Sequence, residues 1–226
     1  MNKITRPTKP KDRECIFTEG INYFATGKKS IWGIGDKDAI QLLNKLKLNG
    51  KWLNLAAGDG RYSSLLLEKV DFITVSDIDK SALSKLWHNT PEKHRHKLKI
   101  KPFNIVKKFP FKNESFEGVF CTGALHLFPR KVLQKIISEI NRVTKRNGRV
   151  VIDFACDIKR ISPDGRLRIF GNEPLYNFKD AKAILRDLLR NYQIKMYKSE
   201  VTEKSESSNP PYILKCKFII LIADKI

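Results

Sequence analysis

The stretch best suited to bind a ligand is LNLAAGDGRY, residues 53–62, where an apolar run is followed by two closely spaced glycines. Gly58 and Gly60 can take positive φ angles and let a ligand lie directly against the backbone. A helix that begins just after them would offer free N–H groups to an anionic group. The third glycine of a dinucleotide site is replaced by Ser63, which weakens the case for NAD(P), and no P-loop lysine follows.

A carboxylate stands at the corresponding place one predicted strand further along the chain. Asp77 ends the segment 71–77, seventeen residues after Gly60. In an open parallel sheet ligands bind at the carboxyl ends of the strands, so Asp77 is expected beside the glycines. A carboxylate there accepts hydrogen bonds from both hydroxyls of a ribose, and such charge-assisted bonds are strong. The two features together predict a ligand that contains a nucleoside.

Both features require strands that end at one edge of a sheet, and the apolar periodicity predicts them. Strands that alternate with helices are predicted at 51–56, 71–77, 98–105, 117–122 and 149–155. The third of these is expected at an edge, because Pro102 cannot donate a ladder hydrogen bond. Two final strands, 193–201 and 212–224, follow each other without a helix between them. The fold class predicted is α/β: a doubly wound, mostly parallel, seven-stranded Rossmann-like sheet with a C-terminal antiparallel hairpin.

Helix start and stop signals divide the rest of the chain. Helices are predicted from the Asp36 cap to Asn49-Gly50, at 62–70, at 80–89 with Asp79 as cap, from Pro129 to Asn147-Gly148, and at 179–191. Residues 157–178 carry glycine and proline at intervals and are predicted to be irregular.

Several motifs fall in order along residues 36–155. The sequence Leu53-Asn54-Leu55-Ala56-Ala57-Gly58-Asp59-Gly60 matches a Leu-Asp-Leu-Gly-Cys-Gly-x-Gly pattern, and Asp77 follows at the end of the second strand. Phe109-Pro110-Phe111, Ser115-Phe116-Glu117-Gly118-Val119, Ala124-Leu125-His126 and Arg146-Asn147-Gly148 continue the series. In these motifs the chain resembles the class I S-adenosylmethionine-dependent methyltransferases, especially the broad group that includes ubiquinone and menaquinone biosynthesis methyltransferases.

The resemblance implies S-adenosylmethionine as cofactor. The cofactor-binding residues that it implies are Asn54, Ala56, Gly58, Gly60, Asp77, Ile78, Asn104, Ile105 and Thr122. Three of them depart from the family pattern: Asn54 replaces an acid that helps hold the cofactor's amino group, Ala56 replaces the first glycine, and Asn104 replaces a common Asp. The side-chain oxygen of Asn104 is still expected to accept a hydrogen bond from the adenine amine.

The implied reaction is transfer of the sulfonium methyl group to a nucleophile by in-line displacement. Because the cofactor carries its own activation, the protein mainly has to align donor and acceptor and exclude water. No catalytic residue is assigned. His126, Tyr212 and Arg166 are candidates for acceptor binding or catalysis, although His126 also suits a packing role and Tyr212 follows an ordinary Asn-Pro-Pro turn.

The acceptor is the least determined part of the prediction. Cations in the segment after the fifth strand, Lys159, Arg160, Arg166 and Arg168, favour a small acceptor with a phosphate or carboxylate group. The chain carries 44 Lys and Arg against 24 Asp and Glu, a formal charge of +20, so an RNA or protein methyltransferase is the alternative. A non-catalytic binder of S-adenosylmethionine is a further alternative, motivated by Asn54.

Other classes of protein are disfavoured. No apolar run approaches the length of a membrane span, and no signal peptide is predicted. The four cysteines are scattered, which indicates reduced thiols in a cytoplasmic protein. His88, His94 and His96 lack the partners of a metal site. Residues 1–13 are predicted to form a flexible basic arm and 14–226 a single methyltransferase domain; the sequence does not specify an oligomeric state.

Overall fold

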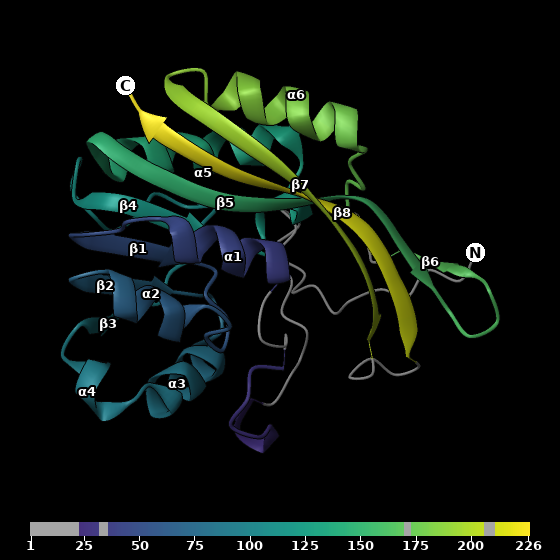
Figure 1. Cartoon of the computed structure of the whole chain (residues 1–226), viewed down its shortest axis with the longest axis horizontal. Helices are drawn as coiled ribbons and strands as arrows, with labels where there is room; N and C mark the ends of the chain where they lie inside the picture. The colour runs from purple at the N-terminus through teal and green to yellow at the C-terminus, as the bar shows by residue number, and fades with distance from the viewer. Residues whose placement is uncertain (1–22, 32–35, 170–172, 206–210) are drawn as a thin grey trace.

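The structure is a computed structural model that describes residues 23–31, 36–169, 173–205 and 211–226 (Figure 1). Within them the strands lie in the order β3-β2-β1-β4-β5-β8-β7, and β6 pairs with β5 off this path. The strands are β1 (Lys51–Leu55), β2 (Phe72–Ser76), β3 (Leu98–Ile100), β4 (Phe116–Cys121), β5 (Thr144–Ile161), β6 (Leu167–Arg168), β7 (Tyr192–Ser205) and β8 (Tyr212–Lys225). Strands β1 to β5 pair in parallel, whereas β8 is antiparallel to both β5 and β7. The predicted fold is confirmed, with β6 as an additional eighth strand.

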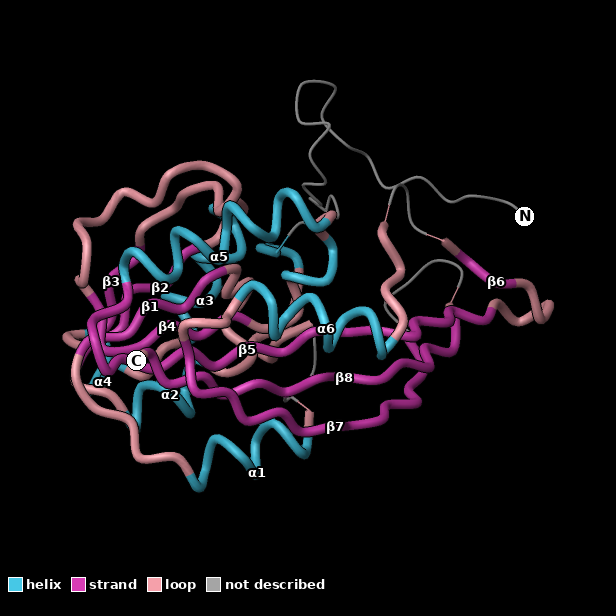
Figure 2. The backbone as a smooth tube through the Cα atoms, turned by 90° about the horizontal axis from the view of Figure 1, so that it is seen from above, coloured by secondary structure: helices cyan, strands magenta, loops and turns pink. Residues whose placement is uncertain are grey.

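Helices cover both faces of this sheet (Figure 2). They are α1 (Lys37–Lys45), α2 (Ser63–Lys69), α3 (Lys80–Asn89), α4 (Glu92–Arg95), α5 (Arg130–Val143) and α6 (Phe178–Leu188), with short 3-10 helices η1 (Tyr23–Ala25) and η2 (Leu125–Leu127). Apolar residues of α1, α2 and α3 pack on one face, and those of α5 and α6 pack on the other. Strand β5 serves both cores, because its side chains alternate: Ile152 and Phe154 face α5 and α6, and Val151 faces the opposite side.

Local signals located the starts of the helices better than their ends. The Asp36 and Asp79 side chains accept hydrogen bonds from the first turns of α1 and α3, as predicted. Helix α1 ends at Lys45, before Asn49-Gly50. Helix α5 likewise ends before its predicted stop, because Thr144 already pairs with Phe116 of β4 and begins β5. Helix α4 was not predicted.

Three strands differ clearly in length from the prediction. Strand β7 continues to Ser205, four residues beyond its predicted end, because it pairs with β8 as far as Tyr212. Strand β3 ends at Ile100, so residues 101–105 form a loop and Asn104 does not end the strand. Strand β5 continues to Ile161, because β8 pairs with it as far as Ile213. The prediction that residues 157–178 are irregular is therefore wrong for the start of this segment, where residues 157–161 belong to β5 and Leu167–Arg168 form β6.

The distal halves of β5, β7 and β8, together with β6, project beyond the helices (Figure 1). We call this part the distal arm; it comprises residues 157–168, 199–205 and 212–217. The predicted basic arm, residues 1–13, lies outside the described residues, as do Cys15, Trp32 and Asn209. No helix in the described part is long and apolar enough to cross a membrane.

Replacing Gly118 by alanine should destabilise the fold at the contact of β1 with β4. A Cβ at Gly118 would lie 2.4 Å from two ring atoms of Trp52, whose side chain is buried opposite it. We expect Gly118→Ala to lower the free energy of unfolding by about 3 kcal/mol, at the upper end of overpacking effects. Denaturant unfolding measures this loss. Gly27→Ala is the control, because nothing lies within 4 Å of its added Cβ, and an equal loss there would contradict the steric explanation.

Candidate functional site

The loop after β1 has the backbone conformation that the glycine pattern predicts. Gly58 has φ of 53° and Gly60 has φ of 95°, both in the left-handed region. A side chain at Gly60 would also collide with Leu86, because its Cβ would lie 2.9 Å from Leu86 Cγ. Ala56, which stands at the family's first glycine, has φ of 50°. The loop therefore keeps the shape of a glycine-rich turn although alanine occupies one of its positions, at a cost in backbone strain.

Asp77 lies beside this loop and is bonded to it. Its Oδ2 accepts a hydrogen bond of 2.8 Å from Gly58 N, and its Oδ1 accepts one of 2.9 Å from Asp79 N. Each carboxylate oxygen keeps a second lone pair, which is the capacity needed to accept two ribose hydroxyls. Burial raises the pKa of Asp77, while the two backbone bonds oppose that shift.

Three more of the predicted cofactor-binding residues, Ile78, Asn104 and Ile105, occupy different environments. Ile78 is exposed at 38%, unusually for a large apolar side chain, and so offers a surface that a planar base would cover. Asn104 is half-buried, and its Oδ1 accepts a hydrogen bond from Val106 N, which closes a turn in the loop after β3. Ile105, by contrast, is buried in the core under α5 and α6.

The remaining predicted site residues lie on β1 and at the end of β4. The Asn54 side chain is buried on β1 at 3% exposure. Thr122 is half-buried directly after β4 and precedes Gly123, whose φ is 69°. The structure thus gathers Ala56, Gly58, Gly60, Asp77 and Thr122 at the carboxyl edge of the sheet, as the doubly wound topology requires.

A buried ion pair, which the sequence analysis did not identify, ties an N-terminal segment to the glycine loop. We call residues 23–31 the strap. Asp59, between the two glycines, accepts hydrogen bonds from Ser30 Oγ at 2.6 Å and Ile31 N at 2.9 Å. Lys85 of α3 donates to Asp59 Oδ2 at 2.8 Å, and the side chains of this pair are 6% and 0% exposed. Lys85 also donates to Thr26 Oγ1 and to the carbonyl oxygen of Lys29, both at 2.8 Å.

The sequence did contain a signal for this pair. Lys85 lies among the buried residues Ala82, Leu83 and Leu86 on α3, and a lysine on the buried side of a helix needs a buried anionic or carbonyl partner. With all three acceptors in place, the ammonium group is fully hydrogen-bonded. The strap is thereby fixed against the loop where the cofactor is expected.

A second group of polar side chains lies on the same side of the sheet, and we call it the polar cluster: Asp36, Arg61, Tyr62 and Asp153. Asp153 on β5 accepts a hydrogen bond of 2.6 Å from Gly123 N, and burial raises its pKa to about 6 despite that bond and the nearby Arg61. The Tyr62 hydroxyl accepts a 2.9 Å bond from Asp36 N, and burial raises its pKa to about 12.

Arg61 gives the polar cluster its positive charge. Its guanidinium carbon lies 5.5 Å from the centre of the Tyr62 ring, and its buried Nε has no hydrogen-bond partner among the described residues. A buried donor of this kind is costly unless a ligand satisfies it. The polar cluster therefore combines a group that can bind an anion with a carboxylate whose pKa allows it to accept a proton at neutral pH.

The three residues considered for acceptor chemistry are placed elsewhere. His126 is buried in η2, and its ring centre lies 6.2 Å from that of Phe154, which fits a packing role. Tyr212 lies in the distal arm, where the centre of its ring is 5.8 Å from the guanidinium carbon of Arg168. Arg166 is exposed there and pairs with Asp164 at 2.7 Å.

Ion pairs of the distal arm weaken the prediction of an anionic acceptor. Arg160 forms two 2.8 Å hydrogen bonds to the Glu173 carboxylate, and both side chains are buried. Two of the four cations expected to bind the acceptor, Arg160 and Arg166, are therefore already held by carboxylates. Among the described residues, no group of three or more His, Cys, Asp or Glu is placed to hold a metal ion.

Comparisons with known proteins concern the family and the fold. Residues 53–152 match a family model described as a methyltransferase domain. No curated protein matches the sequence.

Solved structures share the fold at low sequence identity. A candidate methyltransferase of Bacillus halodurans C-125 has a TM-score of 0.64 and 14% identity, covering 83% of this chain and 97% of its own. A SAM-dependent methyltransferase of Methanosarcina mazei has a TM-score of 0.59 and 18% identity, covering 82% and 97%. The structure of DhpI in complex with SAH has a TM-score of 0.55 and 15% identity, covering 83% and 82%. At these identities the likeness concerns the fold.

Replacing Ala56 by glycine should stabilise the protein. The left-handed conformation costs a residue with a Cβ roughly 1–2 kcal/mol, whereas the extra freedom of glycine in the unfolded chain costs about 0.4–1 kcal/mol. We therefore expect Ala56→Gly to raise the free energy of unfolding by about 0.5–1 kcal/mol, measured by denaturant unfolding.

The neighbouring alanine supplies a matched control for this substitution. Ala57 is not among the described residues with positive φ, so Ala57→Gly should destabilise the protein by about 0.4–1 kcal/mol. If both variants lose stability, Ala56 is not strained.

Proposed function

We propose that this chain is a class I S-adenosylmethionine-dependent methyltransferase that methylates a small acceptor bound at the carboxyl edge of the sheet. The match of residues 53–152 to a methyltransferase-domain model supports this proposal. The single observation that carries this proposal is the Asp77 carboxylate, bonded to Gly58 N at 2.8 Å with lone pairs left for a ribose. When bound, S-adenosylmethionine supplies an electrophilic methyl group on a sulfonium, and the protein supplies orientation.

The described residues fit this cofactor. Asp77 would accept the ribose hydroxyls, and the exposed Ile78 would cover one face of the adenine. The unpartnered Nε of Arg61 would donate to the carboxylate of the methionyl group. The strap, held by Asp59 and Lys85, would exclude water from this side of the cofactor.

We further propose that Asp153 receives the proton of the acceptor. Asp153 accepts a hydrogen bond from Gly123 N, so its side chain lies close to the segment that begins with Thr122, directly after β4. With a pKa of about 6, its carboxylate is ionised at pH 7. It could accept the proton of a hydroxyl as that oxygen attacks the methyl group, or a proton from the ammonium group that forms when an amine is methylated. The side chain is buried, so the proton would not be exchanged with bulk water at that moment.

The acceptor class remains a proposal. The polar cluster supports a small polar acceptor. The pairing of Arg160 with Glu173 and of Arg166 with Asp164 removes much of the support for an anionic one. The net charge of +20 supports RNA as the second candidate. Transfer of label from methyl-labelled cofactor into the RNA, protein and small-molecule fractions of a cell extract separates these candidates; no label in any fraction would favour a non-catalytic binder. A cytoplasmic location is part of this proposal.

Removing the Asp77 carboxylate should abolish tight cofactor binding. Hydrogen bonds to a charged group contribute about 1.5–3 kcal/mol, so Asp77→Ala should weaken S-adenosylmethionine binding by roughly 10- to 150-fold in calorimetry. Binding unchanged by the substitution, or heat with NAD instead of S-adenosylmethionine, would overturn the cofactor assignment.

Asp71 provides the matched control at the opposite edge of the same strands. Its carboxylate Oδ2 accepts a hydrogen bond of 2.8 Å from Gly50 N, just as Asp77 accepts one from Gly58 N. Asp71→Ala should therefore leave cofactor affinity unchanged. Circular dichroism of both variants shows whether the fold is retained.

The pH dependence of methyl transfer should report Asp153. Since its carboxylate form predominates above pH 6, the rate should rise with pH through a midpoint near 6 and level off above it. Asp153→Asn should remove this rise and lower kcat roughly 100-fold or more at pH 8, while the KM for S-adenosylmethionine stays within a few-fold. Transfer of label into the fraction that the unaltered protein methylates is the measurement.

Asp157, four residues further along β5, is the control carboxylate. Its hydrogen bond from Lys217 holds its pKa below the usual value, so it titrates in another range. Asp157→Asn should retain both the rate and the pH profile. A pH profile that persists in Asp153→Asn would contradict the proposed proton transfer.

A further inference from the structure

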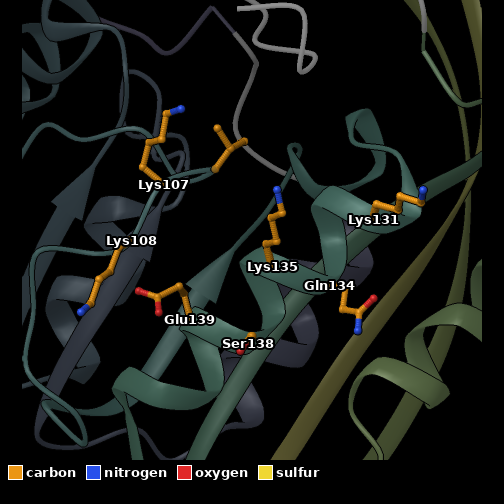
Figure 3. Close-up of a pocket in the computed structure, with 8 residues that line it drawn as sticks. Lys107, Lys108, Lys131, Gln134, Lys135, Ser138 and Glu139 are labelled. Carbon is orange, nitrogen blue, oxygen red and sulfur yellow. The ribbon is translucent and has the colours of Figure 1, made fainter.

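A pocket of about 780 Å³ lies outside the expected cofactor site, between the loop after β3 and the exposed side of α5 (Figure 3). Four lysines line it, two from the loop and two from the helix: Lys107, Lys108, Lys131 and Lys135. We call this pocket the lysine groove. Val106 and Glu139 also line it, and all four lysines are exposed.

The positive charge of the lysine groove is not neutralised by the protein. None of the four lysine ammonium groups forms an ion pair or hydrogen bond with the residues that the structure describes, although the charge of Lys108 helps lower the pKa of Glu139. The Glu139 carboxylate is occupied: it accepts from Arg142 at 2.8 and 2.7 Å and from Phe109 N at 2.6 Å. Its bonds to Arg142 hold the pKa of Glu139 below the usual value, so it stays ionised but paired.

This differs from the distal arm, which is also rich in cations. There Arg160 and Arg166 are bound by carboxylates, and Lys217 pairs with Asp157 at 2.7 Å. Cations that are already paired release little energy on meeting an external anion. The lysine groove therefore presents positive charge that is available to an external anion, unlike these three cations of the distal arm.

The four lysines are spread along the groove and do not converge on one point. Figure 3 shows Lys108 directed away at one end and Lys131 at the other, with Lys107 and Lys135 between them. A single phosphate or carboxylate would need several donors directed at one position. Ammonium groups in a row instead match an extended polyanion that carries one charge per repeating unit.

The uncharged lining of the groove indicates which polyanion this is. Val106 is its one apolar residue among those described, so it lacks the apolar and aromatic centre that protein interfaces use. Gln134 and Ser138 add neutral donors and acceptors on α5, which suit phosphate and sugar oxygens. No described aromatic side chain lines the groove, so bases have no stacking surface there.

We propose that the lysine groove binds a single strand of RNA through its phosphates, without reading its sequence. The loop that carries Lys107 begins at Asn104, which is predicted to contact the adenine of the cofactor, so a bound strand would pass beside that end of the site. The binding itself does not depend on methyl transfer, and it is tested without the cofactor.

The test is fluorescence anisotropy with a labelled 20-nucleotide RNA of mixed sequence, between 50 and 200 mM salt. Each lost contact should lower the slope of log K against log salt by about 0.7. The variant Lys107→Gln, Lys108→Gln, Lys131→Gln, Lys135→Gln should thus lose a slope of about 3 and bind at least 10-fold more weakly at 50 mM salt. A DNA strand of the same sequence should bind within a few-fold of the RNA, because the groove reads phosphates.

A matched variant distinguishes the groove from net charge alone. Lys179, Lys182, Arg186 and Arg190 lie on or just after α6, pair with no described carboxylate, and line no described pocket. Their replacement by Gln removes the same four charges and should reduce the slope by less than 1. Equal losses in both variants, or RNA binding retained by the groove variant, would overturn the proposal.

Two further measurements complete the test. A labelled acidic polypeptide that binds in a groove-dependent manner, while RNA does not, would also overturn the proposal in favour of a protein partner. Calorimetry with S-adenosylmethionine should give the same affinity for the groove variant and the unaltered protein. Failure of RNA binding and failure of the proposed function are therefore separate results.

Discussion

The hydrogen bond from Gly58 N to Asp77 joins the ends of two neighbouring parallel strands, and the candidate site depends on it. It forms only because the loop after β1 turns through positive φ angles at Ala56, Gly58 and Gly60. That turn directs backbone N–H groups at the carboxylate and starts α2 with its N-terminus at the edge of the sheet. At the opposite edge of the same strands, Asp71 accepts the same kind of hydrogen bond from Gly50 N. A hydrogen bond of this kind therefore joins neighbouring strands even where no ligand is expected.

Charged groups are buried around this bridge at positions that a purely structural core would fill with apolar side chains. A buried ion pair is a weak source of stability, because desolvation of both charges offsets their attraction. The Lys85–Asp59 pair has a clear consequence all the same: it fixes the strap against the glycine loop. Asp153, whose pKa is raised, and Arg61, whose Nε has no partner among the described residues, lie on the same side of the sheet.

The cations behind the net charge of +20 have different roles in different parts of the molecule. In the distal arm, cations form ion pairs with the carboxylates of Glu173, Asp164 and Asp157, and these pairs hold local structure together. Along α5 and the loop after β3, lysines have no such partners, and their charge remains available to an external anion. The formal charge includes the cations of both regions. Only the presence or absence of a carboxylate partner shows which cations serve the structure and which are available to bind an anion.

The sequence by itself determined the features that arise from neighbouring residues. The alternation of strands and helices, the caps at Asp36 and Asp79, and the turn glycines follow from local periodicity and local hydrogen bonds, so they could be predicted. The parallel topology then placed Asp77 at the site, because carboxyl ends of parallel strands share an edge.

Only the tertiary structure decided the contacts between distant segments. Asp59 and Lys85 are 26 residues apart, and Gly123 and Asp153 are 30 apart, so no local pattern pairs them. The length of β5 was likewise set by β8, which lies some sixty residues further along the chain and supplies the ladder hydrogen bonds that extend it. Burial, which gives Asp153 its pKa of about 6, exists only once these segments have packed together.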